Sequence, residues 1–149
     1  MKKLLINMGL LICLNVNAQW TKKTVDNGFD DPYRICYTAI NNLGYLKLEN
    51  VDGQIFFYLN GKYCCDESPV INLSFIVNGV TVKYSCTARV SEDKETVWIL
   101  DDFLNSTVVE SFKNCRTLNI RVNDTVCNEE IYSFNMSGST SALNFIRNN

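Results

Sequence analysis

The residues best suited to acid–base chemistry in this sequence are carboxylates that occur in adjacent pairs, above all Asp101-Asp102 and Glu129-Glu130. Glycoside hydrolysis needs two carboxyl groups, one that protonates the leaving oxygen and one that acts as base or nucleophile. Each pair here falls at an expected turn or element end, where a charged side chain is normally solvated. We therefore interpret the pairs as surface features, and a carboxylate-dependent hydrolase is the least favoured functional hypothesis.

The chain contains no histidine, the side chain that most often serves as a base at neutral pH. Ser-His-Asp and Cys-His nucleophilic arrangements are therefore excluded, and so is the HExxH zinc signature. The glycine-rich phosphate-binding motifs and the GxSxG motif are absent as well. The sequence thus predicts a protein that is not an enzyme, with no catalytic residue, cofactor or metal site.

Seven cysteines supply the remaining reactive side chains, one of them inside an N-terminal apolar stretch and six beyond it. An even number of cysteines in an exported domain is typical of a disulfide framework. Hairpin geometry and strand alternation suggest one set of pairs among the many possible: Cys64–Cys86, Cys36–Cys65 and Cys115–Cys127. A native disulfide contributes about 2–4 kcal/mol, so three of them would help to decide whether this domain folds.

Two groups of side chains are candidates for a binding surface. The run Phe56-Phe57-Tyr58 must place rings on both faces of a strand, and the rings outside the core form either an exposed or a covered patch. The run from Ser137 to Ser141 is either a loop presenting hydroxyl groups or a strand-to-helix connection with a serine cap. The possible binding surface comprises Phe56, Tyr58, Tyr63, Ser137 and Ser139.

These side chains must be positioned by short segments rich in Val, Ile, Tyr, Phe and Thr, which alternate with turn residues. The expected strands are 33–40, 45–50, 54–59, 62–66, 70–77, 80–90, 96–100, 117–122 and 131–136. So many short strands predict a mainly β protein, an antiparallel β-sandwich stabilised by disulfides, with a closed barrel as the second choice.

Two Asn-Gly steps, and two segments in which the spacing of apolar residues changes from that of a strand to that of a helix, refine this prediction. Asn60-Gly61 and Asn78-Gly79 both suit type I′ hairpin turns, and the second turn would place Ile71 opposite Cys86. The first turn would place residues 56 and 57 opposite 65 and 64. Apolar residues at helical spacing predict a short helix ending near 112, with a Thr107-x-x-Glu110 capping box, and a last helix capped by Ser139.

The N-terminus has the layout of a secretory signal peptide. Lys2 and Lys3 precede an apolar stretch of about 11 residues, and Val16-x-Ala18 offers small residues at the cleavage position. A membrane-spanning helix needs about 20 apolar residues, so no transmembrane anchor is expected. We predict a signal peptide at 1–18, an N-terminal arm at 19–32 and a single domain at 33–149, in an exported protein that is periplasmic or secreted.

The charge of the chain limits its partners. Loss of Lys2 and Lys3 with the leader lowers the count of Lys and Arg from 14 to 12 against 16 Asp and Glu, so the net charge becomes −4. A nucleic-acid partner needs a cluster of basic residues, and the longest run after the leader is Lys22-Lys23. The expected partner is a protein or a glycan of the envelope.

The last third of the chain resembles a family of small exported proteins. The segment Tyr132-Ser133-Phe134-Asn135-Met136-Ser137-Gly138-Ser139, followed by Ala142-Leu143, resembles the C-terminal pattern of the TagO/VasI group associated with type VI secretion. Uncharacterised proteins of Bacteroidota and their phages are similar. The resemblance implies an accessory β-sandwich protein of the cell envelope, and it transfers no catalytic residue.

The favoured hypothesis is therefore a non-enzymatic exported binding module, an accessory of the bacterial envelope that recognises its partner through a sheet face or loops. The alternative is an inhibitor or immunity-type protein that blocks an exported enzyme, since such proteins are also small, acidic and rich in disulfides. An inhibitor should form a tight 1:1 complex, whereas an accessory module should associate with several envelope components.

Overall fold

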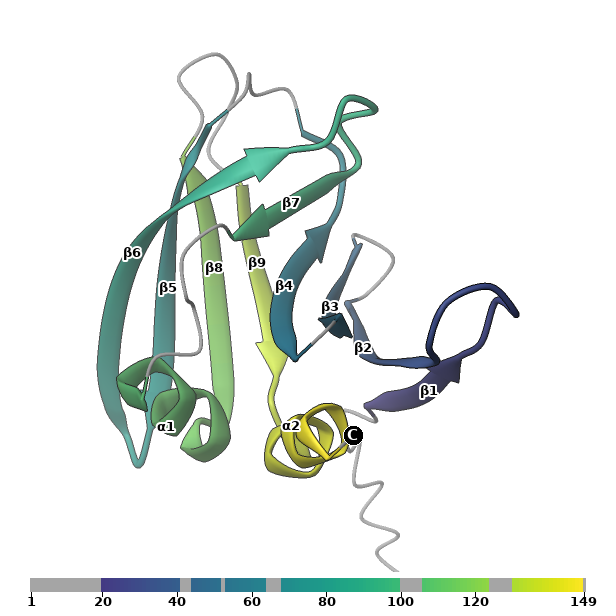
Figure 1. Ribbon diagram of the computed structural model, residues 1–149. Helices are drawn as coiled ribbons and strands as arrows, with labels where there is room; N and C mark the ends of the chain where they lie inside the picture. The colour runs from purple at the N-terminus through teal and green to yellow at the C-terminus, as the bar shows by residue number, and fades with distance from the viewer. Residues whose placement is uncertain are drawn as a thin grey trace, which may run out of the picture.

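The computed structural model describes residues 20–40, 44–51, 53–63, 68–99, 106–123 and 130–148. Within these ranges the chain forms nine strands and two short helices (Figure 1). In order they are β1 Thr21–Val25, β2 Tyr33–Ile40, β3 Gly44–Val51, β4 Gln54–Asn60, β5 Val70–Val77, β6 Val80–Val90, β7 Thr96–Ile99, α1 Ser106–Asn114, β8 Thr117–Asn123, β9 Glu130–Asn135 and α2 Ser139–Arg147. The prediction of a mainly β protein with one or two short helices is confirmed.

The strands form one continuous antiparallel sheet in the order β1-β2-β3-β4-β7-β6-β5-β8-β9. The connection between its two halves is β6, whose residues 80–87 pair with β5 and whose last three residues, from Ala88 to Val90, pair with β7. Figure 1 shows β6 curving from one layer into the other. The predicted antiparallel sandwich is therefore found in part: two layers are present, but they are the halves of one open sheet, because one long strand belongs to both. The second choice, a closed barrel, is not formed, since the order ends in two different edge strands.

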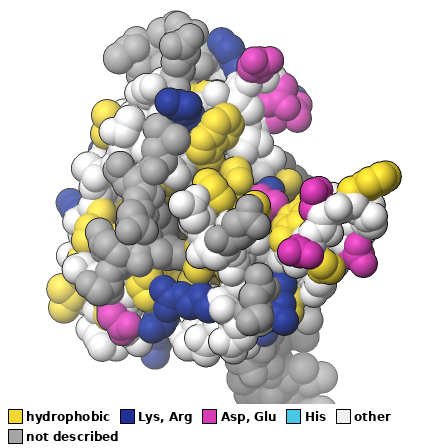
Figure 2. Space-filling view, viewed as in Figure 1, with side chains coloured by type: hydrophobic (Ala, Val, Ile, Leu, Met, Phe, Trp, Pro, Cys, Tyr) yellow, Lys and Arg dark blue, Asp and Glu magenta, His cyan; other side chains and the backbone are white. Residues whose placement is uncertain are grey.

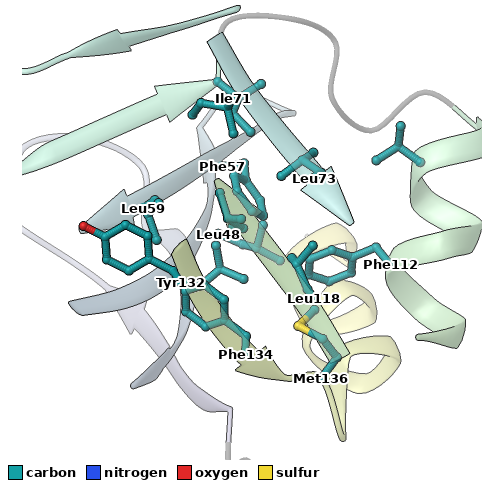
Figure 3. Packing of buried hydrophobic residues seen from close by; sticks show 14 of the residues in the cluster. Leu48, Phe57, Leu59, Ile71, Leu73, Phe112, Leu118, Tyr132, Phe134 and Met136 are labelled. Carbon is teal, nitrogen blue, oxygen red and sulfur yellow. The ribbon is translucent and has the colours of Figure 1, made fainter. Parts of the chain in front are cut away.

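The core lies between the two layers of this folded sheet. Figure 3 shows how side chains from β3, β4, β5, β8, β9 and α1 point toward one another. Fully buried members include Leu48, Phe57, Ile71, Leu118 and Phe134. These residues occupy every second position of their strands, so the alternation of the sequence identifies the face of each strand that enters the core.

The hairpin of β5 and β6 forms as the sequence predicts. Asn78 and Gly79 both have positive φ, 50° and 82°, which is the backbone that a type I′ turn requires. Ile71 consequently lies opposite Cys86, as expected. A correct turn fixes the register, and the register decides which side chains face inward.

The Asn60-Gly61 step does not form a hairpin. Asn60 is the last residue of β4 and pairs with Thr96 of β7, while residues 56 and 57 lie opposite Glu49 and Leu48 of β3. A Cβ at Gly61 would lie 2.6 Å from the hydroxyl oxygen of Tyr132, so a larger residue there would have to displace this side chain. The predicted strand 62–66 is not formed at Lys62 and Tyr63, and its remaining residues lie outside the described ranges.

The segment 19–32, predicted as an arm, contains the edge strand β1, which pairs with β2. Its side chains are mostly exposed, which explains why Thr21–Val25 shows no apolar alternation. Lys22 donates a hydrogen bond of 2.6 Å to the hydroxyl of Ser141 in α2. The strand therefore belongs to the domain, and its position links the start of the chain to the last helix.

Helix α2 packs across the inner face of β1, β2 and β3, where polar side chains bind its C-terminal carbonyls. Asn50 donates a hydrogen bond of 2.7 Å to the carbonyl oxygen of Ile146, and Arg34 donates one of 3.1 Å to that of Phe145. The Arg34 guanidinium also lies 5.2 Å from the Phe145 ring centroid. A cation at this end of a helix is favourable, because the last carbonyls lack partners within the helix and carry partial negative charge.

The described cysteines do not form disulfides with one another. Cys36 and Cys115 are buried thiols, and their sulfur atoms face the carbonyl oxygens of Ala142 and Phe112. Each predicted pair joins one described cysteine to one outside the described ranges, namely 64, 65 or 127. Since Cys36 and Cys115 are thiols here, the structure does not support the predicted stabilisation by disulfides, and the described fold rests on hydrophobic packing and hydrogen bonds.

Neither described helix is long or apolar enough to span a membrane.

Candidate binding surface

Two of the five predicted surface residues are buried and serve the fold. Tyr63 is 7% exposed, its ring lies 6.1 Å from that of Tyr132, and its hydroxyl donates to the carbonyl oxygen of Leu59. Ser139 is 2% exposed, and its hydroxyl donates to the carbonyl oxygen of Phe112. The structure therefore does not place these two side chains on an exposed binding surface. Each hydroxyl finds a carbonyl acceptor, which lets a polar side chain be buried at little cost.

Ser137 is exposed and belongs to the turn before α2, where its backbone N–H donates to the Asn135 side chain. Gly138, with φ of 87°, is the N-cap of the helix, so Ser139 is its first residue and not its cap. The structural interpretation of this serine run, a strand-to-helix connection, is correct, although Ser139 does not cap α2 and its hydroxyl instead bonds to carbonyl oxygens in the last turn of α1. The expected Thr107 capping box also fails, because Thr107 is the second residue of α1 and Glu110 pairs with Lys113.

Phe56 and Tyr58 are the predicted residues that lie together on the outside of the sheet. Both are half-buried, and their rings are 6.2 Å apart on the outer face of β4, whose inner face carries Phe57 and Leu59. This face is also rich in rings on neighbouring strands. Tyr37 of β2 and Tyr45 of β3, for example, have ring centroids 5.9 Å apart.

The strand register arranges five of these outer side chains in one row across the sheet. Neighbours on adjacent strands are Tyr37 and Lys47, Lys47 and Tyr58, Tyr58 and Trp98, and Trp98 and Arg89. We call these five residues the outer row. Adjacent strands are about 4.8 Å apart, so the outer row extends roughly 19 Å. Three aromatic rings and two cations are thus available to one extended ligand.

Electrostatic contacts hold the middle of the outer row. The Lys47 ammonium lies 4.2 Å from the Tyr58 ring centroid and forms a 3.0 Å salt bridge with Glu49. Burial, together with the charge and hydrogen bonding of Glu49, raises the pKa of the Tyr58 hydroxyl to about 12. Tyr58 is therefore a neutral hydrogen-bond donor across the physiological pH range, and its ring is fixed by charged neighbours.

Replacement of Glu49 by Gln should lower the pKa of Tyr58, though not to its ordinary value, because burial remains as the largest cause of the shift. The protonated hydroxyl is the favoured form in the folded protein. Its contribution to stability is therefore full below pH 10 and is lost as the pH rises toward 12. An ultraviolet tyrosinate titration, with Tyr58→Phe to identify the step, measures the shift. An unchanged pKa in Glu49→Gln would contradict this assignment.

Sequence reasoning missed most of the outer row. Tyr37 and Trp98 lie in correctly predicted strands, and their alternation with buried neighbours signals an outward direction. What the sequence does not reveal is that β7 pairs with β4, and this pairing brings Trp98 beside Tyr58. The surface becomes visible only once the strand order is known.

The described residues offer little to covalent chemistry. Burial raises the pKa of the Cys36 and Cys115 thiols to about 12, so both stay protonated and poorly nucleophilic at neutral pH. No group of three His, Cys, Asp or Glu side chains comes together in the described ranges in the way that a metal ion requires. The carboxylates at 101, 102 and 129 lie outside these ranges, and the structure does not describe the side chain of Glu130.

Comparison with known proteins identifies a similar fold and no family. No protein-family model matches the sequence, and no curated protein does so either. A crystal structure of invasion associated protein B from Bartonella henselae superposes with a TM-score of 0.58 at 14% sequence identity. The match covers 87% of this chain and 92% of the other. At this identity the similarity establishes the fold alone: this chain has an architecture similar to that of invasion associated protein B.

Proposed function

We propose that this protein is a non-enzymatic, exported binding module of the bacterial envelope, and that its outer row recognises a protein or a glycan. The observation that carries the proposal is the placement of Tyr37, Tyr58 and Trp98 with two cations on the outside of the sheet. These side chains are not needed to fill the core, which lies on the opposite face.

The composition of the outer row supports recognition. Tyr, Trp and Arg are the residues most enriched among those that dominate binding energy at interfaces. Their rings offer large apolar faces at a small entropic cost, while the Tyr58 hydroxyl and the Arg89 guanidinium add polar specificity. Since Lys47 is engaged by Glu49, the face carries both signs of charge and is not a simple anion site.

The rigidity of the surface also supports this function. The rings of the outer row are attached to paired strands, so their positions are largely fixed before a ligand arrives. A preorganised surface loses less conformational entropy on binding than a flexible loop does. Export through a signal peptide, the likeness to the TagO/VasI group and the lack of an active site remain predictions on which this proposal relies.

The test measures binding to defined glycans and to envelope proteins. Chitooligosaccharides, peptidoglycan fragments and dextran are titrated by calorimetry, and an envelope extract is passed over the immobilised protein. For a ligand found in this way, Tyr58→Ala and Trp98→Ala should each weaken binding by about tenfold or more. The matched control is Ile131→Ala, which removes a 57% exposed side chain that lies on β9, away from the outer row.

Three outcomes would contradict the proposal. One is equal affinity of wild type, Tyr58→Ala and Trp98→Ala for the ligand. Another is turnover of the ligand during the titration, which would make the protein an enzyme. The third is a lack of saturable binding to every glycan of the set together with a lack of any retained envelope protein.

A further inference from the structure

A second surface, separate from the outer row, lies at the tip of the β1–β2 hairpin. Phe29 in this connection is 95% exposed, the most exposed of the large hydrophobic side chains that the structure describes. Figure 1 shows the hairpin projecting away from the two layers of the sheet. In Figure 2 it extends to the right, with hydrophobic atoms at its end and acidic side chains just behind them.

Other residues of the tip form the turn, and the Phe29 ring takes no part in it. The side-chain oxygen of Asn27 accepts hydrogen bonds from the backbone N–H groups of Phe29 and Asp30, at 2.9 and 3.0 Å. Asp26 accepts one from the N–H of Gly28, whose φ is 74°. These contacts use the Phe29 backbone alone, so a smaller residue at this position would fold equally well.

The exposure of Phe29 differs in kind from that of the other large hydrophobic residues on the surface. Val70, Val80 and Ile131 lie on strands, where a β-branched side chain favours the extended backbone whether or not it is buried. Phe29 lies outside the strands, at the far end of a loop. Its ring therefore has no role in local structure, and an aromatic ring held in solvent is the type of group that anchors an interface.

Three carboxylates lie close to Phe29 in the sequence of the tip. Asp26, Asp30 and Asp31 lie within three residues of Phe29, and none of them forms a salt bridge with a described residue. Their charge opposes insertion of the tip into an anionic membrane surface. A second copy of this chain is also disfavoured, since the protein itself has a net negative charge.

We propose that the hairpin tip docks into a partner protein, placing Phe29 in an apolar pocket that is rimmed by Lys and Arg side chains. The hydrogen bonds of the turn fix the backbone of the tip before the partner arrives, which reduces the entropy lost on binding. The carboxylates steer the approach of a basic rim, so association is faster and tighter at low salt. This surface is distinct from the outer row, because it rests on different residues. It lies at the turn between β1 and β2, whereas the outer row lies on the outer face of the sheet from β2 to β6.

The first experiment identifies what the tip contacts. Full-length protein carrying p-benzoyl-L-phenylalanine at position 29 is irradiated with the soluble and membrane fractions of the producing cells. The matched control carries the same photoreactive group at Val80, another exposed hydrophobic position at a hairpin turn. We expect a protein adduct from position 29 that position 80 does not give. The proposal is overturned by the same adducts from both positions, by adducts only with lipid or with a second copy, or by none.

The second experiment tests the chemistry with the purified, cross-linked partner. Phe29→Ala should weaken its binding by tenfold or more with an unchanged melting temperature, whereas Phe29→Trp should retain most of the affinity. Asp31→Lys, at a residue that takes no part in the turn, should weaken binding severalfold at low salt and less at high salt. Tyr58→Ala should have no effect. Equal affinity of Phe29→Ala and wild type, or tighter binding by Asp31→Lys, would overturn the proposal.

Discussion

Replacement of Trp20 by Ala should lower the free energy of unfolding by about 3–5 kcal/mol, as expected for a large aromatic side chain removed from a core. Trp20 is 7% exposed although it precedes the first strand, and its ring lies 5.9 Å from that of Phe112 in α1. Its Cδ1 atom also faces Gly138 at the start of α2. The ring therefore joins both helices at the base of the sheet.

The variant Trp20→Phe separates the contribution of the buried ring from that of the indole N–H group. The Nε1 nitrogen of Trp20 is buried and has no hydrogen-bond partner among the described residues, which is unfavourable by itself. Trp20→Phe removes this group and retains most of the ring, so it should cost far less than Trp20→Ala, about 1 kcal/mol or less. Urea denaturation of the three proteins measures the difference. Equal stability of the Ala variant and wild type would show that Trp20 does not anchor the helices.

Replacement of Gly44 by Ala should destabilise the protein by roughly 3 kcal/mol or more, enough to prevent folding if the domain is marginally stable. Gly44 begins β3 with φ of 151°, a conformation that L-residues rarely adopt. An added Cβ would overlap the carbonyl oxygen of Asn60, the last residue of β4. Since that oxygen belongs to the backbone of a paired strand, it cannot move aside without breaking the pairing.

Gly53 provides the matched control, because it lies at the other end of the same hairpin. Its φ is also positive, at 82°, but no atom lies within 4 Å of the Cβ position. Gly53→Ala should thus show the backbone strain alone, about 1–2 kcal/mol. Thermal denaturation of soluble protein, together with the soluble yield on expression, compares the two variants. If both lose the same stability, the close approach of Gly44 to Asn60 is not important for the fold.

Alternation of apolar and polar residues was sufficient to predict most strands and their inner faces. In β5 and β8, for example, buried residues such as Leu73 and Ile120 alternate with polar ones, and the Asn78-Gly79 turn fixes a register that the structure confirms. Such features depend on neighbouring residues in the sequence. Local physics is therefore enough to identify them.

Features that depend on contacts between distant residues could not be predicted in this way. The two Asn-Gly steps look alike, yet Gly61 lies against the side chain of Tyr132, about 70 residues later in the chain. Tyr63 and Ser139 have polar tips, and the carbonyl acceptors that permit their burial are set by tertiary structure. The same holds for the outer row, in which the placement of β7 beside β4 brings Tyr58 and Trp98 together.

That the two layers belong to a single sheet also depends on contacts between distant residues, so it could not be predicted from the sequence. The alternation from Val80 to Val90 correctly predicts a long strand. That its last three residues pair with β7 while the others pair with β5 depends on where β7 lies. A strand that is long enough to serve both layers is the one local sign of this architecture.

The two tryptophans of the chain provide the most direct test of the proposed function. Trp98 lies in the outer row, whereas Trp20 is buried against the helices, so their indole N–H signals report on the binding surface and on the core. A ¹⁵N–¹H spectrum is recorded during titration with the glycan or envelope protein retained in the binding assay. The account predicts a saturable shift of the Trp98 signal with little change at Trp20. A shift of Trp20 with no change at Trp98 would contradict it.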